Sequence, residues 1–150
     1  MYAAAPKGDF TVTGPVPGAG VRVIDTATGA VVRTHRTDGL VFPVHVTATG
    51  LVLAGELRMR AGGPALGEQV PGLLHVYGED GEELGRVEVG AFPLTITSSP
   101  DGRYGYVAAV SSSTVTVVDL PRREAVATLH VDRAGEPGAH GLAYIPSPAV

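Results

Sequence analysis

The sequence predicts an all-β protein that forms one domain over residues 1–150. Three observations support this expectation. Val and Thr dominate the apolar runs, and β-branched residues favour strands. The chain also has 21 Gly and 12 Pro, which interrupt it too often for long helices. In addition, a strand-like motif recurs, as VRVID at 21–25, LHVYG at 74–78 and VTVVD at 115–119.

A second strand with alternating apolar and polar residues follows each copy of the motif. These strands are VVRTH at 31–35, LGRVEVG at 84–90 and AVATLHV at 125–131. A turn and another short apolar run come next each time. Repeats that consist only of strands, with a period of roughly 40–50 residues, are typical of β-propeller blades, which are four-stranded antiparallel sheets. The sequence therefore predicts about three blades.

The individual strands can be placed in chain order, with the strands of a blade called a, b, c and d from the axis outward. The first copy starts on a b strand at Tyr2–Ala5, and the last segment, HGLAYIP at 140–146, is expected to be an a strand. The segments between these two are expected to form the remaining strands, for a total of about twelve. We expect the in-phase valines of the c strands to be buried between blades: Val21, Val23, Val76, Val115 and Val117.

Composition narrows the class of function. The net charge is −4 at pH 7, whereas a nucleic-acid binder needs a basic surface, so no nucleic-acid partner is expected. No apolar run is long enough to predict a membrane span. Cysteine is absent, which excludes thiol catalysis and thiolate metal sites, and no cofactor motif is present. The segment MYAAAPKGDF does not look like a signal peptide, so a cytoplasmic location is the default expectation.

The repeats resemble the YVTN-type β-propeller repeat family. The resemblance is carried by the third copy from Tyr104 to Val131, by VIDTATGAVVRT at 23–34 and by PLTITSSPDG at 93–102. It implies a propeller fold but no single function, because this fold hosts enzymes, cofactor domains and binding modules. One departure is that Ala4 and Ala108 replace the Asn that usually follows Tyr-Val in this family.

About three blades do not close a ring, and the terminal strands would leave unpaired edges. A head-to-tail contact between two copies would pair these edges and give about six blades, within the usual range for propellers. The chain itself, as a homodimer, is therefore the expected partner. A fragment of a longer propeller and an open three-blade unit are the alternatives.

A ligand site is expected on the top face, where the b–c and d–a connections lie. Two long insertions, at 6–20 and 57–72, belong to that face, whereas the a–b and c–d connections on the bottom face are tight turns. Long connections in compact domains are often functional. His45 and His140 are expected at the starts of a strands near the axis, where imidazoles could bind a ligand or a metal. No HxH or HxxxH pair is present, so no metal site is predicted.

Four further residues are candidates for ligand binding. His35 and His130 are expected at equivalent d-strand ends near charged residues, and Glu56 and Arg58 lie at the second insertion. The alternative for each is a solvated charge, and His75 is expected to serve blade packing or a surface hydrogen bond. The best-supported function is a binding or interaction module. The alternatives are a small-molecule enzyme, such as a lactonase-like hydrolase, lyase or isomerase with a His-lined channel mouth, and a purely structural half-propeller.

Overall fold

The computed structural model describes residues 2–5, 18–60, 68–133, 135 and 138–145. Within these residues there are eleven strands and no helix. The first sheet comprises β1 (Tyr2–Ala5), β2 (Gly20–Ile24) and β3 (Val31–Arg36). The second and third sheets have four strands each: β4 (Leu40–Val46), β5 (Val52–Met59), β6 (Gln69–Tyr77) and β7 (Glu83–Ala91), then β8 (Pro93–Ser98), β9 (Tyr104–Ala109), β10 (Thr114–Asp119) and β11 (Glu124–His130).

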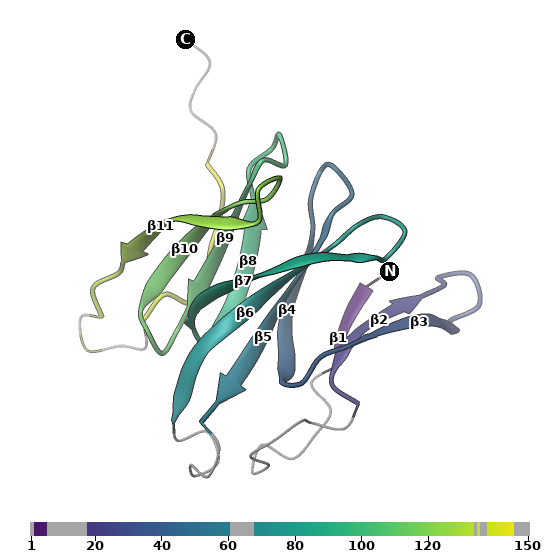
Figure 1. Ribbon diagram of the computed structural model, residues 1–150, viewed down its shortest axis with the longest axis horizontal. Helices are drawn as coiled ribbons and strands as arrows, with labels where there is room; N and C mark the ends of the chain where they lie inside the picture. Colours follow the sequence, from purple (N-terminus) through teal and green to yellow (C-terminus); the bar gives the residue numbers. More distant parts are fainter. Residues whose placement is uncertain (1, 6–17, 61–67, 134, 136–137, 146–150) are drawn as a thin grey trace.

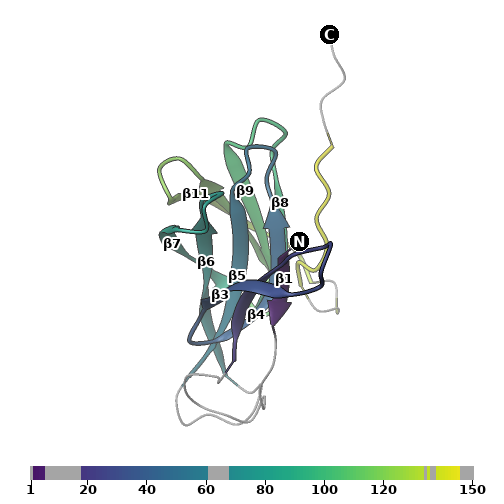
Figure 2. The ribbon, with the colours of Figure 1, turned by 90° about the vertical axis from the view of Figure 1, so that its right-hand side faces the viewer.

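The three sheets are arranged as a fan (Figure 1). Every strand pairs antiparallel with its neighbour in the sequence, so each sheet is a simple up-and-down meander. Strands β4 and β8 pack together at one edge of the fan, and β7 and β11 lie at the other edge (Figure 2). The prediction of an all-β fold from antiparallel sheets is thus confirmed. No helix in the described residues is long and apolar enough to span a membrane.

The tight turns of the bottom face share one feature. Each of four turns contains a glycine with positive φ, a conformation that residues with a Cβ adopt only at a cost: Gly29, Gly50, Gly81 and Gly102. Asp25 shows how such a turn is held, because its Oδ1 accepts hydrogen bonds from the N–H groups of Ala27 and Thr28. In Figure 1 the β4–β5 and β8–β9 turns, with Gly50 and Gly102, lie at the upper end of the sheets.

Two separate cores hold the sheets together. The first interface, between the first and second sheets, contains Val21, Val41, Val52, Ala54 and Tyr77. The second interface, between the second and third sheets, contains Leu53, Leu74, Val76, Val87, Val89, Ile96, Val107, Val118 and Leu120. Alternate residues of a strand point to opposite faces. Strand β6 therefore contributes to both interfaces, with Leu74 and Val76 on one side and Tyr77 on the other.

The structure corrects two expectations about element boundaries. Strand β4 begins at Leu40, before Pro43, because a bulge between Val41 and Val44 accommodates the proline, which has no N–H to donate. The insertion at 57–72 is also shorter than expected, since β5 continues to Met59 and β6 begins at Gln69. Most of the other insertion, residues 6–17, lies outside the described residues.

The strand expected at 140–146 is not formed within residues 138–145, so this part of the prediction is wrong. A strand needs a hydrogen-bonded neighbour along its length, and no described strand pairs with this segment. It lies instead on the outer face of the third sheet, where Ala139 and Leu142 pack against Ala108 and Val115. Pro146 lies outside the described residues.

The burial of the c-strand valines agrees with the prediction only in part. Val21 and Val76 are fully buried between sheets. Val115 is buried, but by Ala139 rather than by the second sheet, because it points to the outer face of the third sheet. Val23 and Val117 are only half-buried. The residue of β10 that packs against the second sheet is Val118.

Candidate functional site

A chain of charged side chains crosses the second sheet from β5 to β7. His75 on β6 occupies its centre, with its Nε2 2.6 Å from Glu56 Oε2 and its Nδ1 2.9 Å from Glu83 Oε1. Arg86 extends the chain by donating to both carboxylate oxygens of Glu83, at 2.6 and 3.0 Å. At the other end, the backbone N–H of Gly39 donates to Glu56 Oε1 at 2.7 Å. We call Glu56, His75, Glu83 and Arg86 the buried relay.

Hydrogen bonds satisfy the polar groups of the buried relay. Each ring nitrogen of His75 lies within hydrogen-bond distance of a carboxylate oxygen, one of Glu56 and the other of Glu83. His75 and Glu56 are almost completely buried, at 1% and 3% exposure, so these contacts compensate for their removal from water.

The pKa directions agree with this arrangement. Burial raises the pKa of Glu56, but the hydrogen bond and charge of His75 and the N–H of Gly39 outweigh it, and the net pKa is lowered. The hydrogen bond from Arg86, against a smaller effect of burial, lowers the pKa of Glu83. Burial, with the nearby Glu83 charge, raises the pKa of Tyr77 to about 12, so this phenol stays neutral.

The candidate residues predicted from the sequence do not meet in one place. His45 lies at the end of β4, beside the a–b turn, rather than at the start of the strand. It therefore belongs to the bottom end of the axis, where its Nε2 hydrogen-bonds Ser98 Oγ at 2.9 Å. Burial lowers the pKa of His45, which favours its neutral form. His140 is exposed, and its carbonyl accepts a hydrogen bond from Thr95 Oγ1.

The other four candidates divide between the core and the rim. Glu56 is part of the buried relay. Arg58 is exposed near the top face, where it donates to the carbonyl of Pro71 and lies 3.9 Å from Glu88. His35 and His130 lie near the ends of β3 and β11, but the expected equivalence is wrong by one residue: His35 pairs with Val21, whereas the matching Val115 pairs with Leu129, and His130 pairs with Thr114. His130 is exposed, whereas the ring of His35 stacks on Tyr77 with centroids 4.5 Å apart.

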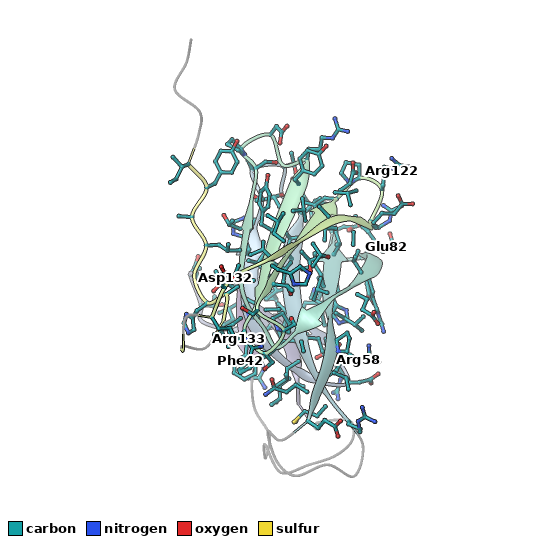
Figure 3. All side chains as sticks on the ribbon, turned by 90° about the vertical axis from the view of Figure 1, so that its left-hand side faces the viewer. Phe42, Arg58, Glu82, Arg122, Asp132 and Arg133 are labelled. Atoms are coloured by element: carbon teal, nitrogen blue, oxygen red, sulfur yellow. The ribbon has the colours of Figure 1, made fainter. Side chains whose placement is uncertain are left out.

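A groove opens on the bottom face between the second and third sheets. Its volume is about 610 Å³, within the usual range for ligand sites. Its apolar lining comes from Leu51, Leu84, Leu120 and Pro121, and its charged lining from Asp101, Arg103, Asp119, Arg122 and Arg123. Figure 3 shows Arg122 at the bottom-face end of the molecule, with Glu82 below it and Arg58 towards the opposite end. We call this feature the bottom groove.

Most charges of the bottom groove already have partners within the protein. Asp101 accepts from the hydroxyl of Ser99 and the N–H of Arg103, which lowers its pKa. Asp119 accepts from the N–H of Arg122 at 3.1 Å and lies 3.7 Å from the guanidinium of Arg103. The guanidinium of Arg122 itself lies 3.3 Å from Glu124. Arg123 is the exception, since no hydrogen bond or ion pair joins its guanidinium to any described residue.

Sequence reasoning missed both the buried relay and the bottom groove. The relay joins residues 56, 75 and 83, which are brought together by cross-strand pairing and not by local spacing. The groove is formed by turns, and the sequence predicts only that these turns are tight. Two consecutive arginines in the turn LPRRE at 120–124 were the available signal, because charged residues at a tight turn are necessarily presented to solvent.

The fold is similar to solved β-propeller structures. Hydrazine synthase of Kuenenia stuttgartiensis matches with a TM-score of 0.63 and 18% identity, over 88% of this chain and 35% of that chain. The Dos1 propeller matches with a TM-score of 0.64 and 11% identity, over 80% of this chain and 29% of that chain. This chain therefore spans well under half the length of either structure. Neither a family model nor a curated protein matches the sequence.

These likenesses define the class: the chain is a β-propeller-like domain. At such low identities they concern the fold alone. The resemblance to YVTN-type repeats stays a prediction from the sequence.

Proposed function

We propose that this domain is a non-catalytic interaction module built from three propeller blades. The observation that carries the proposal is the contrast between its two polar sites. The histidine that is paired with carboxylates, His75, is enclosed between sheets, where a substrate does not reach it. The open bottom groove instead combines an apolar lining with guanidinium groups, a composition suited to recognition.

The alternative of a small-molecule enzyme has less support. It requires His45 and His140 to converge at one channel mouth on the top face. His45 instead lies at the bottom end of β4 and is engaged by Ser98. A ligand site at the top face, formed with the insertion at 6–20, stays a prediction because residues 6–17 are not described.

We further propose that a second copy completes the ring. Two features support this. In the described residues β1 pairs only with β2, so its other edge is open. Residues 138–145 lie on the outer face of the third sheet without a strand beside them, in the position of the innermost strand of a following blade. If this segment paired with β1 of another copy, the open edge of β1 and the segment itself would both gain hydrogen-bond partners. Two copies would then give about six blades.

The solution mass tests this assembly. We expect twice the 15.3 kDa of one chain in light scattering at micromolar concentration. Leu129 on β11, which is 55% exposed beside Val115, should be needed for the contact, so Leu129→Asp should give a folded monomer. Leu84→Asp is the matched control, since Leu84 is 41% exposed but lies at the bottom groove. A monomer for the unmodified chain, or a dimer that survives Leu129→Asp, would contradict the proposal.

A further inference from the structure

Arg123 is held over the bottom groove from the third sheet towards the second. It lies in the turn between β10 and β11, and its side chain runs along Gly85 of β7. A Cβ at Gly85 would come within 2.7 Å of Arg123 Cδ, so a larger residue there would displace this side chain from its present path. Arg123 therefore reaches across the groove, and its guanidinium ends there without a partner among the described residues.

The backbone of Arg123 is unusual for its position. Its φ is 56°, in the left-handed region that glycine adopts most easily. In the two corresponding turns, between β2 and β3 and between β6 and β7, the positive-φ residues are Gly29 and Gly81. An arginine here thus carries a conformational cost that the other two sheets avoid. Strain of this kind is often found where a side chain has a functional role.

The remaining lining of the bottom groove indicates what Arg123 would bind. The protein has a net charge of −4, yet at this groove both aspartates are engaged internally, Arg103 and Arg122 are paired with Asp119 and Glu124, and only Arg123 is left without a described partner. The available charge at the groove is therefore positive. Beside it, Leu84 and Leu51 present apolar surface, and Leu120 is buried beneath. The groove thus offers one site for a carboxylate next to one for an aliphatic side chain.

We propose that the bottom groove binds an acidic, leucine-containing peptide segment of a partner protein. A carboxylate of the segment pairs with Arg123, and an adjacent leucine-type side chain packs on Leu51 and Leu84. Arginine suits this role because its planar guanidinium can hold a carboxylate by two parallel hydrogen bonds. This inference rests on the proposed role as an interaction module but not on the closure of the ring.

The proposal can be tested by titrating the protein with the peptide Ac-ELDLE-NH2 and measuring the dissociation constant by calorimetry. We expect binding that weakens as salt increases, because the carboxylate contact is exposed. Arg123→Gly should weaken binding at least threefold while the thermal midpoint stays the same or rises, since glycine relieves the positive φ. Arg123→Gln, which retains the backbone strain, should also weaken binding at least threefold.

Matched controls separate the groove from general charge and apolar effects. Arg60→Gln removes an arginine that is 63% exposed on the β5–β6 connection, at the opposite end of β5 from the turn that carries Leu51, and should change the affinity less than threefold. Leu84→Ala should weaken binding at least threefold, whereas Val46→Ala, at 47% exposure outside the groove, should not. A loss below threefold for both Arg123 variants overturns the proposal.

Other probes distinguish the class of ligand. The peptides Ac-KLKLK-NH2 and Ac-ESESE-NH2 lack the acidic and the apolar element, respectively, and each should bind at least threefold more weakly. If either binds as well as Ac-ELDLE-NH2, the proposed recognition is wrong. If hexanoate binds as tightly as the peptide, the groove is a small-carboxylate site and the peptide proposal fails. The solution mass is measured in parallel, so a failure of peptide binding is distinguishable from a failure of self-assembly.

Discussion

The two interfaces between the sheets differ in chemistry although they share β6. The second interface is apolar, with Leu74 and Val76 of β6 fully buried against the third sheet. The first interface receives His75 and Tyr77 from the same strand, and His75 is part of the buried relay. Because a strand alternates its side chains, one segment of sequence supplies two surfaces that are stabilised in different ways.

The two interfaces are therefore expected to contribute differently to the stability of the fold and to the specificity of sheet packing. Burial of apolar side chains stabilises the second interface in any register that keeps the area buried. The buried relay requires one arrangement, because each buried charge must meet its partner. Glu56 also receives the N–H of Gly39, which lies on the connection between the first and second sheets. The relay therefore fixes how the first sheet is joined to the second.

The largest loss of stability should follow when Glu56 is removed from the buried relay. Glu56→Ala leaves a buried ring nitrogen of His75 and the N–H of Gly39 without their partner, and should cost about 3–5 kcal/mol of unfolding free energy. Urea denaturation measures this cost. Glu56→Gln is the control, because its amide has the same size and can still hydrogen-bond both groups. Equal losses for the two variants would show that the negative charge of Glu56, which both variants remove, provides the stability, and not its packing or hydrogen bonds.

A similar but chemically distinct loss is expected at the second interface. Leu74→Ala removes a fully buried side chain and should cost about 2–5 kcal/mol, depending on how far the cavity collapses. The cost should be nearly independent of pH between about 4 and 7, since no titratable group contributes to this cluster. A strongly pH-dependent loss in the same urea experiment would mean that the two interfaces are coupled.

The pH dependence of stability should distinguish the interfaces further. The folded-state pKa values of Glu56 and Glu83 are lowered, so the unfolded chain binds protons more readily than the folded one. Their stabilising contribution is complete above the ordinary carboxyl pKa, about 4.3, and is lost as pH falls through the lowered values. The unmodified protein should therefore lose more stability than Glu56→Gln between about pH 5 and 3. Parallel acid titrations followed by circular dichroism would show this; coinciding curves would refute it.

The smallest effect tests the inward and outward faces of the c strands. Val76→Ala removes two buried methyl groups and should cost about 1.5–2 kcal/mol of unfolding free energy. Val117 is half-buried within one chain and points away from the second sheet, so Val117→Ala should cost less than about 1 kcal/mol at concentrations low enough for the chain to be monomeric. Thermal denaturation of both variants compares them directly. If Val117→Ala proves as costly as Val76→Ala, its face of the third sheet is covered in solution, as ring closure would require.

The sequence was sufficient to predict most of the strands and their antiparallel order, but not the strand expected at 140–146. Alternation in VTVVD and the glycines of the turns act locally, through backbone preference and strand period, and neighbouring strands then pair antiparallel. The repeat placed His35 and His130 near strand ends but not in one register: His35 pairs with Val21, whereas His130 pairs with Thr114 and not with the matching Val115.

Only the tertiary structure decided which polar residues meet. The position of His45 depends on where β4 begins: the strand starts at Leu40 and continues through Pro43 by a bulge, so His45 lies near its far end. Glu56, His75 and Glu83 are far apart in the sequence and meet because three strands pair in one register. The bottom groove arises where turns of two sheets face each other. Local patterns determine strands because backbone preferences are short-ranged, whereas sites depend on register and sheet packing, which no single segment contains.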